Sequence, residues 1–248
     1  MTLETFFSEH RKVALGFSGG VDSSYLLWAA LNSGAEIKAY YVSTAFQPAF
    51  EREDALRLAG ALGVEPAVLE LDILACSEVS ENPPDRCYYC KKQIFGAVCR
   101  KARGDGFDVL LDGTNASDDA GDRPGMRALE ELSVLSPLRI CGLTKEEIRR
   151  RSREAGLFTW DKPAYACLAT RTPAGERITA RLLRRTEEAE TALAALGFRD
   201  FRVRHRGDEA FVEITKEQRA LLRENWDRME AVLKEKGYRK VFLDMASR

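Results

Sequence analysis

Short apolar runs alternate with amphipathic helical patterns through the first 160 residues of the chain. Four of these runs have the length and composition of buried strands: 13–17, 36–44, 66–72 and 108–113. Apolar residues recur at helical spacing between them, and the last such helix starts at Thr144, with Glu147 completing a capping box. Because strands that alternate with helices imply a parallel sheet with right-handed crossovers, the sequence predicts an α/β fold.

The last third of the chain has a different pattern. A long helical pattern over 179–198 precedes two strand patterns, and Gly207-Asp208 between these strands predicts a hairpin. A second helix and a short closing strand follow. We therefore predict three parts: a parallel-sheet domain over 1–160, a Pro/Gly-punctuated connector over 161–176, and a smaller α+β domain over 177–248.

The composition predicts a folded protein without a membrane segment. Apolar residues make up 45% of the chain, which is too high a share for a disordered protein. Neither a run of about 18 apolar residues nor a secretory leader is present, so we expect a cytoplasmic protein. Residues 1–165 hold 20 Lys and Arg against 25 Asp and Glu, and residues 166–248 hold 18 against 14. This mildly basic tail favours a local anionic pocket over a large nucleic-acid surface.

A glycine-rich loop, residues 18–24, follows the first predicted strand. Two glycines let the backbone approach a ligand closely, and the next helix adds the positive end of its dipole, so the loop suits a phosphate. Three serines can donate further hydrogen bonds, whereas Asp22 is better suited to hold Mg²⁺. The lysine of a Walker loop is missing, which disfavours γ-phosphate transfer. The alternative is a tight glycine turn capped by serines.

This segment, SGGVDSS, resembles the loop of the PP-loop pyrophosphatase superfamily, whose motif is SGG-x-DS. The resemblance implies a Rossmann-like PP-loop domain that binds ATP, adenylylates a substrate and releases pyrophosphate and later AMP. It also implies that the loop residues bind the nucleotide: Ser18, Gly19, Gly20, Asp22, Ser23 and Ser24.

The six cysteines are expected to be metal ligands, catalytic thiols or buried side chains, because disulfides are rare in a reducing compartment. Cys87 and Cys90 form a CxxC at a predicted helix start, among basic residues that favour the thiolate. A structural zinc site is poorly supported, since the chain has two histidines and no second CxxC. Together with Cys167 of the connector, this pair can bind a [4Fe–4S] cluster with one open iron. Alternatively, Cys167 is itself a nucleophile or sulfur source, or a small buried residue.

Several segments together resemble the LarE family, the ATP-dependent sulfur transferases of nickel-pincer cofactor biosynthesis. They cover nearly the whole chain: SGGVDSS, NPPDRCYYCKKQIF, DGTNASDD, GDRPG, SPL, WDKPAYACLATRTPAGERIT, RVRHRG and VEI. The resemblance implies that a carboxylate of pyridinium-3,5-biscarboxylic acid mononucleotide is activated with ATP and becomes a thiocarboxylate. It also implies a sulfide source and a homo-oligomer.

The family has two branches that differ in their source of sulfur. In one branch, the cysteine at the position of Cys167 gives up its own sulfur and becomes dehydroalanine. In the other, cysteines at the positions of Cys87, Cys90 and Cys167 are thought to hold a [4Fe–4S] cluster that carries a removable sulfide. We favour the cluster for this chain, because both additional thiols lie at a predicted helix start.

Acidic residues after the fourth strand are candidate metal ligands. Gly113 of this segment is a predicted nucleotide-binding residue, at the edge of the sheet where ligands bind. Asp118, Asp119 and Asp122 could bind Mg²⁺ or orient Arg123, and turn capping is the alternative for each of the three.

Candidate substrate-binding residues come mainly from the C-terminal part. Arg171, Arg202 and Arg204 could clamp the substrate phosphate, although alternation along a strand also exposes charges at this spacing. Glu213 could bind a metal or pair with an arginine on the next strand. Tyr88 could stack on an aromatic ring of a ligand or simply pack.

Other functional classes remain open. A PP-loop tRNA thiolase also uses ATP, but it predicts a strongly basic surface or an added RNA-binding module, whereas the pI here is about 6.3. An amidating synthetase needs an ammonia source and leaves the CxxC and Cys167 unexplained. A nucleotide sensor or cluster scaffold would bind ATP without forming AMP.

Overall fold

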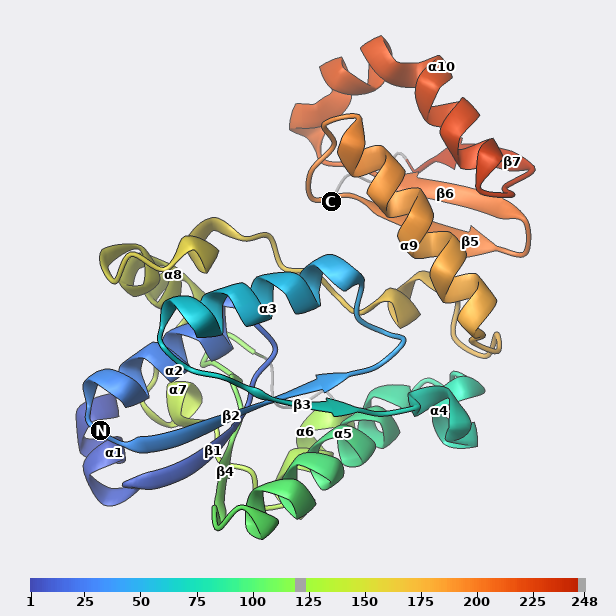
Figure 1. Cartoon of the computed structure of the whole chain (residues 1–248). Coiled ribbons are helices and arrows are strands. Elements are labelled where there is room, and N and C mark those ends of the chain that lie inside the picture. Colours follow the sequence, from blue (N-terminus) through green and yellow to red (C-terminus); the bar gives the residue numbers. More distant parts are fainter. Residues whose placement is uncertain (119–123, 245–248) are drawn as a thin grey trace. The chain divides into compact units, whose positions relative to one another are not determined.

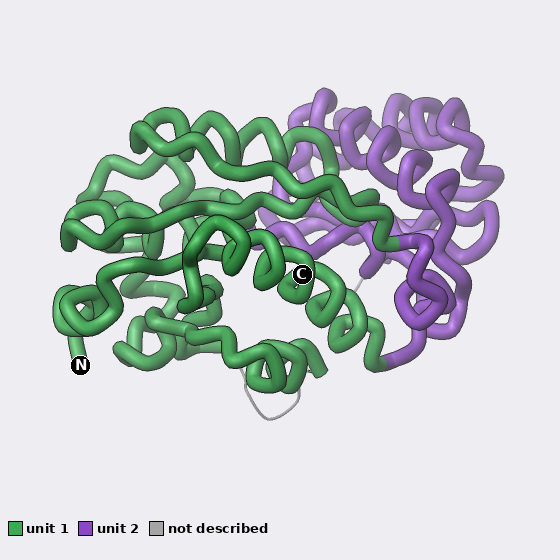
Figure 2. Tube along the Cα trace, turned by 60° about the horizontal axis from the view of Figure 1, so that its bottom comes forward, with its two compact units in different colours: residues 1–73, 85–162 green, residues 74–84, 163–248 purple. Residues whose placement is uncertain are grey.

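The computed structural model describes residues 1–118 and 124–244, which form two compact units (Figures 1 and 2). Unit 1 comprises residues 1–73 and 85–162. Unit 2 comprises residues 74–84 and the chain from residue 163 onward. The chain therefore leaves unit 1 after its third strand and returns to it at the start of the CxxC helix.

Unit 1 is built on four parallel strands in the order β3-β2-β1-β4. The predicted α/β class with a parallel sheet is thus confirmed. Alternate residues of β1 point to opposite faces, with Val13 and Leu15 in one core and Ala14 in the other. The strands are β1 (Lys12–Gly16), β2 (Glu36–Ser43), β3 (Ala67–Glu70) and β4 (Val109–Leu111).

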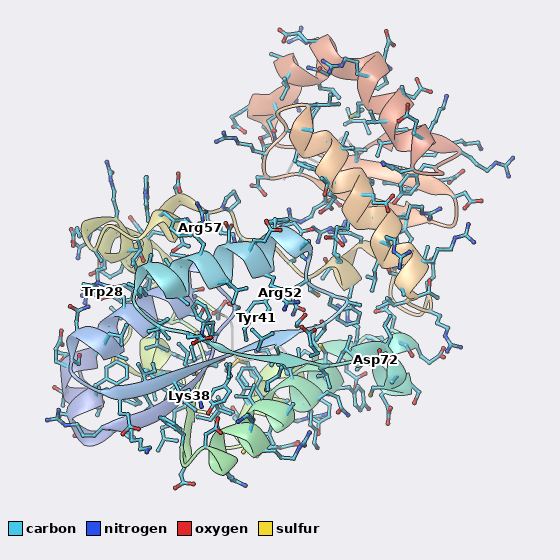
Figure 3. The ribbon with its side chains drawn as sticks, in the orientation of Figure 1. Trp28, Lys38, Tyr41, Arg52, Arg57 and Asp72 are labelled. Carbon is cyan, nitrogen blue, oxygen red and sulfur yellow. The ribbon has the colours of Figure 1, made fainter. Side chains whose placement is uncertain are left out.

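Helices cover both faces of this sheet, as expected for parallel strands with apolar side chains on both sides. Tyr41 of β2 is buried on one face in the same core as Ala55 and Leu58 of α3 (Figure 3). This face carries α1 (Leu3–Glu9), α2 (Val21–Asn32), α3 (Ala49–Ala61), α7 (Pro137–Ile140) and α8 (Lys145–Glu154). The other face carries α5 (Arg86–Gly104) and α6 (Pro124–Glu131).

Two helix starts bear on the site. The Thr144 half of the predicted capping box of α8 is confirmed, because the Thr144 hydroxyl accepts a hydrogen bond from the backbone N–H of Glu147 at 3.3 Å. The carboxylate of Glu147 binds Arg150 and Arg151. The stretch over 76–86, which contains two prolines, holds the short helix α4 (Ser77–Ser80) and the first residue of α5.

Unit 2 contains the second sheet, in the order β5-β6-β7. The predicted hairpin is present, with Gly207 at a φ of 56° between antiparallel β5 and β6. Strand β7 pairs with β6 in parallel. Two helices close the apolar core: the elements are α9 (Ala180–Ala195), β5 (Arg202–Arg206), β6 (Glu209–Glu213), α10 (Arg219–Glu235) and β7 (Lys240–Leu243). No helix among the described residues is long and apolar enough to span a membrane.

Candidate active site

The glycine-rich loop joins the end of β1 to the first turn of α2. Gly19 has a φ of 73°, and a Cβ at this position would lie 2.4 Å from the Cβ of Ala55 on α3. Only glycine fits both restrictions. The hydroxyl oxygens of Ser18 and Ser23 lie 3.1 Å apart and join the two ends of the loop. A helix start of this kind directs its first backbone N–H groups toward an anion.

A cavity of about 240 Å³ lies beside the loop, at the carboxyl edge of the sheet. The ends of β1 and β4, the first turn of α2, and side chains of α5 and α6 line it. Six residues predicted from the sequence surround this one cavity: Ser18, Gly20, Asp22, Ser23, Gly113 and Asp118. Gly19 packs against α3 and the side chain of Ser24 is fully buried, and neither residue is among those that line the cavity.

Close backbone approach shapes the cavity. A Cβ on Gly113 would lie 3.0 Å from the backbone nitrogen of Ser23, so the segment after β4 reaches the start of α2. Likewise, a Cβ on Gly16 would lie 2.7 Å from the ring of Phe95 on α5. Glycine at both positions therefore allows β1, α2, α5 and the segment after β4 to approach one another closely around the cavity.

Among the titratable side chains that line this cavity, Asp22 has the clearest shift in pKa. Its Oδ2 lies 2.5 Å from Nζ of Lys145, the first residue of α8. Its Oδ1 is buried and has no hydrogen-bond partner among the residues that the structure describes. Burial raises the pKa of Asp22, and the ammonium of Lys145 opposes that rise. An unpartnered carboxylate oxygen beside an anion-binding loop fits a ligand of Mg²⁺.

The other acidic residues of the cavity have internal partners. Asp112 accepts hydrogen bonds from the hydroxyls of Thr114 and Ser136, the latter at 2.6 Å. Asp118 accepts one from the backbone N–H of Asn115 at 3.1 Å, within the turn that follows β4. The predicted residues Asp119, Asp122 and Arg123 lie outside the described residues.

The CxxC lies in the first turn of α5, as the sequence predicts. The Cys87 side chain is exposed, with Nη2 of Arg86 at 3.9 Å from its sulfur, and Cys90 is half-buried. Cys167, also half-buried, belongs to unit 2 and precedes a turn of 3₁₀ helix. Within residues 1–118 and 124–244, no three His, Cys, Asp or Glu side chains are grouped closely enough to hold a metal ion.

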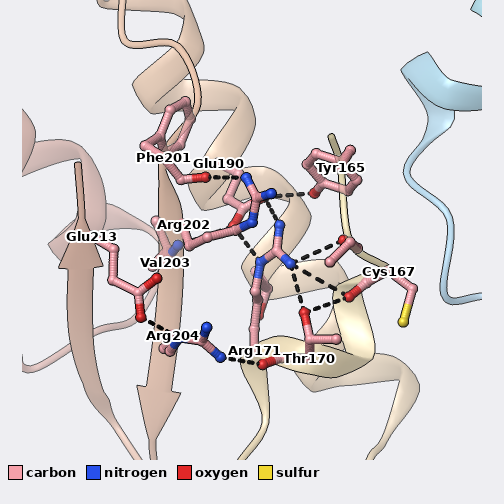
Figure 4. Close-up of polar contacts among 12 residues, drawn as sticks. Tyr165, Cys167, Thr170, Arg171, Glu190, Phe201, Arg202, Val203, Arg204 and Glu213 are labelled. Atoms are coloured by element: carbon pink, nitrogen blue, oxygen red, sulfur yellow. Dashed lines mark hydrogen bonds and ion pairs between the residues drawn. The ribbon is translucent and has the colours of Figure 1, made fainter. Parts of the chain in front are cut away.

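The three predicted phosphate clamps bind the backbone near Cys167 (Figure 4). Arg171 is fully buried, pairs with Glu190 through two hydrogen bonds of 2.7 and 3.0 Å, and donates to the carbonyl oxygen of Ala166. Arg202 donates to the carbonyl oxygen of Ala164 at 2.7 Å. Arg204 donates to that of Thr170 at 2.6 Å.

The three arginines differ in how much of each side chain is exposed to solvent. Alternation along β5 predicts that Arg202 faces solvent, but the residue is only 4% exposed. Its guanidinium is buried because it lies against backbone carbonyls. The Arg204 side chain is 47% exposed, and its Nε donates to the carboxylate of Glu213. Glu213 is thus the partner of an arginine on the neighbouring strand, one of its two predicted roles.

Tyr88 is packed between α5 and α6. Its hydroxyl donates to the carboxylate of Glu131 at 2.8 Å, and the guanidinium of Arg127 lies 3.9 Å from the centre of its ring. The residue is 8% exposed, so the surface available to a ligand in this conformation is small.

Several residues of the cavity region were not assigned to the nucleotide site from the sequence. Lys91 and Phe95 line the cavity from α5, Asp112 lines it from the end of β4, and Lys145 contacts it through Asp22. Lys91 and Phe95 follow the CxxC at helical spacing, so the helical pattern could have placed them on one face. Lys145 has no such local signal.

The loop, the parallel sheet and the cavity at its carboxyl edge define a PP-loop nucleotide-binding enzyme. No protein-family model matches the chain. The chain is 30% identical over 246 residues to the pyridinium-3,5-bisthiocarboxylic acid mononucleotide synthase of Lactiplantibacillus plantarum, covering 98% of this chain and 89% of that protein. It therefore belongs to the LarE family of PP-loop, ATP-using sulfurtransferases.

Two further relatives are similar to this chain over different shares of its length. An uncharacterised protein of Synechocystis is 34% identical over 218 residues, covering 87% of this chain and 81% of that protein. The tRNA-specific 2-thiouridylase of Thermotoga petrophila is 28% identical over 193 residues, covering 61% of this chain and 54% of that protein. The likeness to the thiouridylase is thus partial in both chains.

Proposed function

We propose that this chain activates a carboxylate of pyridinium-3,5-biscarboxylic acid mononucleotide with ATP and converts it into a thiocarboxylate. The observation that carries the proposal is the 30% identity to the Lactiplantibacillus plantarum synthase over 98% of the chain. The cavity beside the glycine-rich loop supports it, because it offers an anion site at the edge of the sheet where ligands bind.

The first half-reaction would use unit 1. The loop backbone, the start of α2 and the hydroxyls of Ser18 and Ser23 would hold the polyphosphate. Asp22 would hold Mg²⁺ through its unpartnered oxygen, with Asp118 close by, and the bound ion would neutralise phosphate charge. A carboxylate oxygen of the substrate attacks the α-phosphorus, the bond to the β-phosphate oxygen breaks, and pyrophosphate leaves.

The second half-reaction would bring sulfur to the acyl-adenylate carbonyl carbon, with AMP as the leaving group. The proposed ligands of a [4Fe–4S] cluster are Cys87, Cys90 and Cys167, and the cluster would supply a removable sulfide. Two thiols on the first turn of α5, one of them exposed, suit the first two ligand positions. In the alternative, the Cys167 thiolate attacks the carbonyl carbon; loss of its Cα proton with cleavage of the Cβ–S bond then leaves dehydroalanine.

Substrate binding is proposed for the arginines of unit 2. Arg204 is the strongest of these candidates, because its side chain is 47% exposed while that of Arg171 is fully buried. Arg202 and Tyr88 would need to exchange internal contacts to bind a ligand. In the proposed division, residues 1–160 bind ATP, 161–176 present Cys167, and 177–248 bind substrate and self-associate.

The test is an anaerobic turnover with ATP and the pyridinium dicarboxylate. We expect AMP, pyrophosphate and a thiocarboxylate, measured by chromatography and mass spectrometry. A brown chromophore that Cys87→Ala abolishes and Cys99→Ala retains would support the cluster, since Cys99 packs in the core of unit 1. Loss of the mass of H₂S at Cys167, without bound iron, would instead establish sacrificial transfer. No AMP from ATP and substrate would refute the proposal.

A tRNA thiolase is the second candidate, favoured by the partial likeness to the Thermotoga thiouridylase. It predicts salt-dependent binding of tRNA and sulfur incorporation into a nucleoside. Gel-shift titration with tRNA at two salt concentrations, followed by nucleoside analysis after turnover, separates the two candidates.

A further inference from the structure

The loop that would bind a polyphosphate carries a carboxylate and no lysine. Asp22 lies at the first turn of α2 and lines the cavity, with one oxygen buried and without a partner in the described ranges 1–118 and 124–244. A negative side chain at this point opposes the binding of another anion unless a cation neutralises it. The repulsion is strong here, because a partly buried charge is screened less by solvent.

The Asp22 carboxylate is paired with a lysine from a distant part of the sequence. Nζ of Lys145 lies 2.5 Å from Oδ2 of Asp22, although the residues are 123 positions apart in the sequence. The Lys145 backbone is held in place, because its N–H donates to the Ser117 hydroxyl at 2.9 Å and Thr144 caps the same helix. Arg149, one turn further along α8, donates instead to the carbonyl oxygens of Trp160 and Lys162.

We propose that Lys145 is the positioning residue that neutralises Asp22 and thereby prepares the glycine-rich loop for the polyphosphate of ATP. The inference rests on the proposed nucleotide site. Lys145 acts through Asp22: it holds Oδ2 and leaves Oδ1 available to a divalent cation. Since Mg²⁺ would also neutralise Asp22, the contribution of Lys145 is greatest when the metal is absent.

The test is a double-mutant cycle of ATP affinity, measured by calorimetry in EDTA and again in Mg²⁺. In EDTA, we expect Lys145→Met to weaken ATP binding about tenfold, and less in Mg²⁺, because removing the ammonium leaves one uncompensated charge at the anion site. Asp22→Asn should tighten binding in EDTA. The double variant should bind close to wild type, since it lacks both charges and the pair is neutral again.

Three controls separate this role from a general loss of positive charge. Arg150→Met removes a charge from the exposed side of α8, where Arg150 pairs with Glu147 and Glu154, and should leave ATP affinity unchanged. Lys145→Arg keeps the charge and should restore most of the affinity. Adenosine lacks phosphates, so its affinity should not respond to Lys145→Met.

The outcomes are distinguishable. If the wild-type chain binds no ATP in either buffer, the proposed nucleotide site itself is wrong. If it binds ATP and Lys145→Met binds equally well in EDTA, or if the double variant binds as weakly as Lys145→Met, the role of Lys145 is refuted. Should circular dichroism show that Lys145→Met is unfolded, Asp22→Asn decides alone: unchanged or weaker ATP binding in EDTA overturns the proposal.

Discussion

Buried charges are paired differently in the cavity of unit 1 and in the arginine network of unit 2, which is centred on Arg171 and Glu190. Asp22 has one oxygen paired with Lys145, and the other has no partner in the part of the chain that the structure describes. Arg171 and Glu190 share two hydrogen bonds and bind further groups on both sides. An incompletely paired charge is available to a ligand, whereas a fully paired one fixes the backbone around it. The first unit thus keeps binding capacity, and the second uses its charges to hold the segment that carries Cys167.

The largest expected effect comes from breaking the buried pair of unit 2. Glu190→Gln keeps the shape of the side chain but leaves the guanidinium of Arg171 buried without a counter-charge. We expect a loss of about 3–5 kcal/mol in the free energy of unfolding. Urea denaturation followed by circular dichroism measures it.

A matched control lies on the same helix. The Glu188 side chain is 51% exposed and only 3.9 Å from Lys236, so Glu188→Gln should cost less than about 1 kcal/mol. If Glu190→Gln is as stable as Glu188→Gln, the network of unit 2 does not hold its structure in the way that we describe.

The next effect tests the loop of unit 1. Gly19→Ala combines a positive φ with a clash against Ala55, and we expect it to destabilise the protein by about 2–4 kcal/mol and to abolish ATP binding. Gly34 has nearly the same φ, 69°, and apart from its chain neighbours no atom of the described residues lies within 4 Å of an added Cβ. Gly34→Ala should therefore show the backbone cost alone, with ATP affinity retained. Equal losses from both variants, by thermal unfolding and calorimetry, would contradict the close packing of the loop.

The contrast between the two units also marks how far the sequence could be interpreted. The loop and its flanking strand and helix depend on neighbouring residues, so periodicity and glycine spacing were enough to predict them. The contact between Lys145 and Asp22 joins residues 123 positions apart, and no local pattern signals it. The same holds for residues 74–84, where the carbonyl oxygen of Ser80 accepts a hydrogen bond from the N–H of Ile178.

Charged residues were harder to interpret than glycines. Arginine is the residue type that commonly binds phosphate, which is why the sequence suggests this role for Arg171, Arg202 and Arg204. The sequence alone does not distinguish phosphate binding from binding to backbone carbonyls. The structure shows that Ala164, Ala166 and Thr170 provide those carbonyls, through turns whose geometry local periodicity does not determine.

A pH-dependent effect of intermediate size is expected in unit 2. His205 is buried, and burial together with the nearby Arg185 lowers its pKa from 6.5 to about 4. The fold favours the neutral ring, so His205 contributes stability above pH 6.5 that is lost as the pH falls from 6.5 through about 4. We expect this loss to reach about 2 kcal/mol. In urea unfolding from pH 7.5 to 4, the difference between wild type and His205→Asn should shrink with acidification; a constant difference would refute the assignment.

The smallest change in unfolding free energy is expected at Arg204, which binds a backbone carbonyl and is also exposed enough to meet a ligand. Its side chain is 47% exposed and paired with Glu213, so Arg204→Ala should cost at most about 1 kcal/mol in unfolding free energy. If Arg204 also binds the substrate phosphate, the same variant should weaken binding of the pyridinium mononucleotide about tenfold or more, because a charged hydrogen bond to the ligand is lost. Arg206→Ala, on the next exposed position of β5, is the control that should change neither quantity strongly. A stability loss as large as that of Glu190→Gln would place Arg204 among the charges that hold the backbone, whereas weaker binding at unchanged stability would place it with Asp22 among those that meet a ligand.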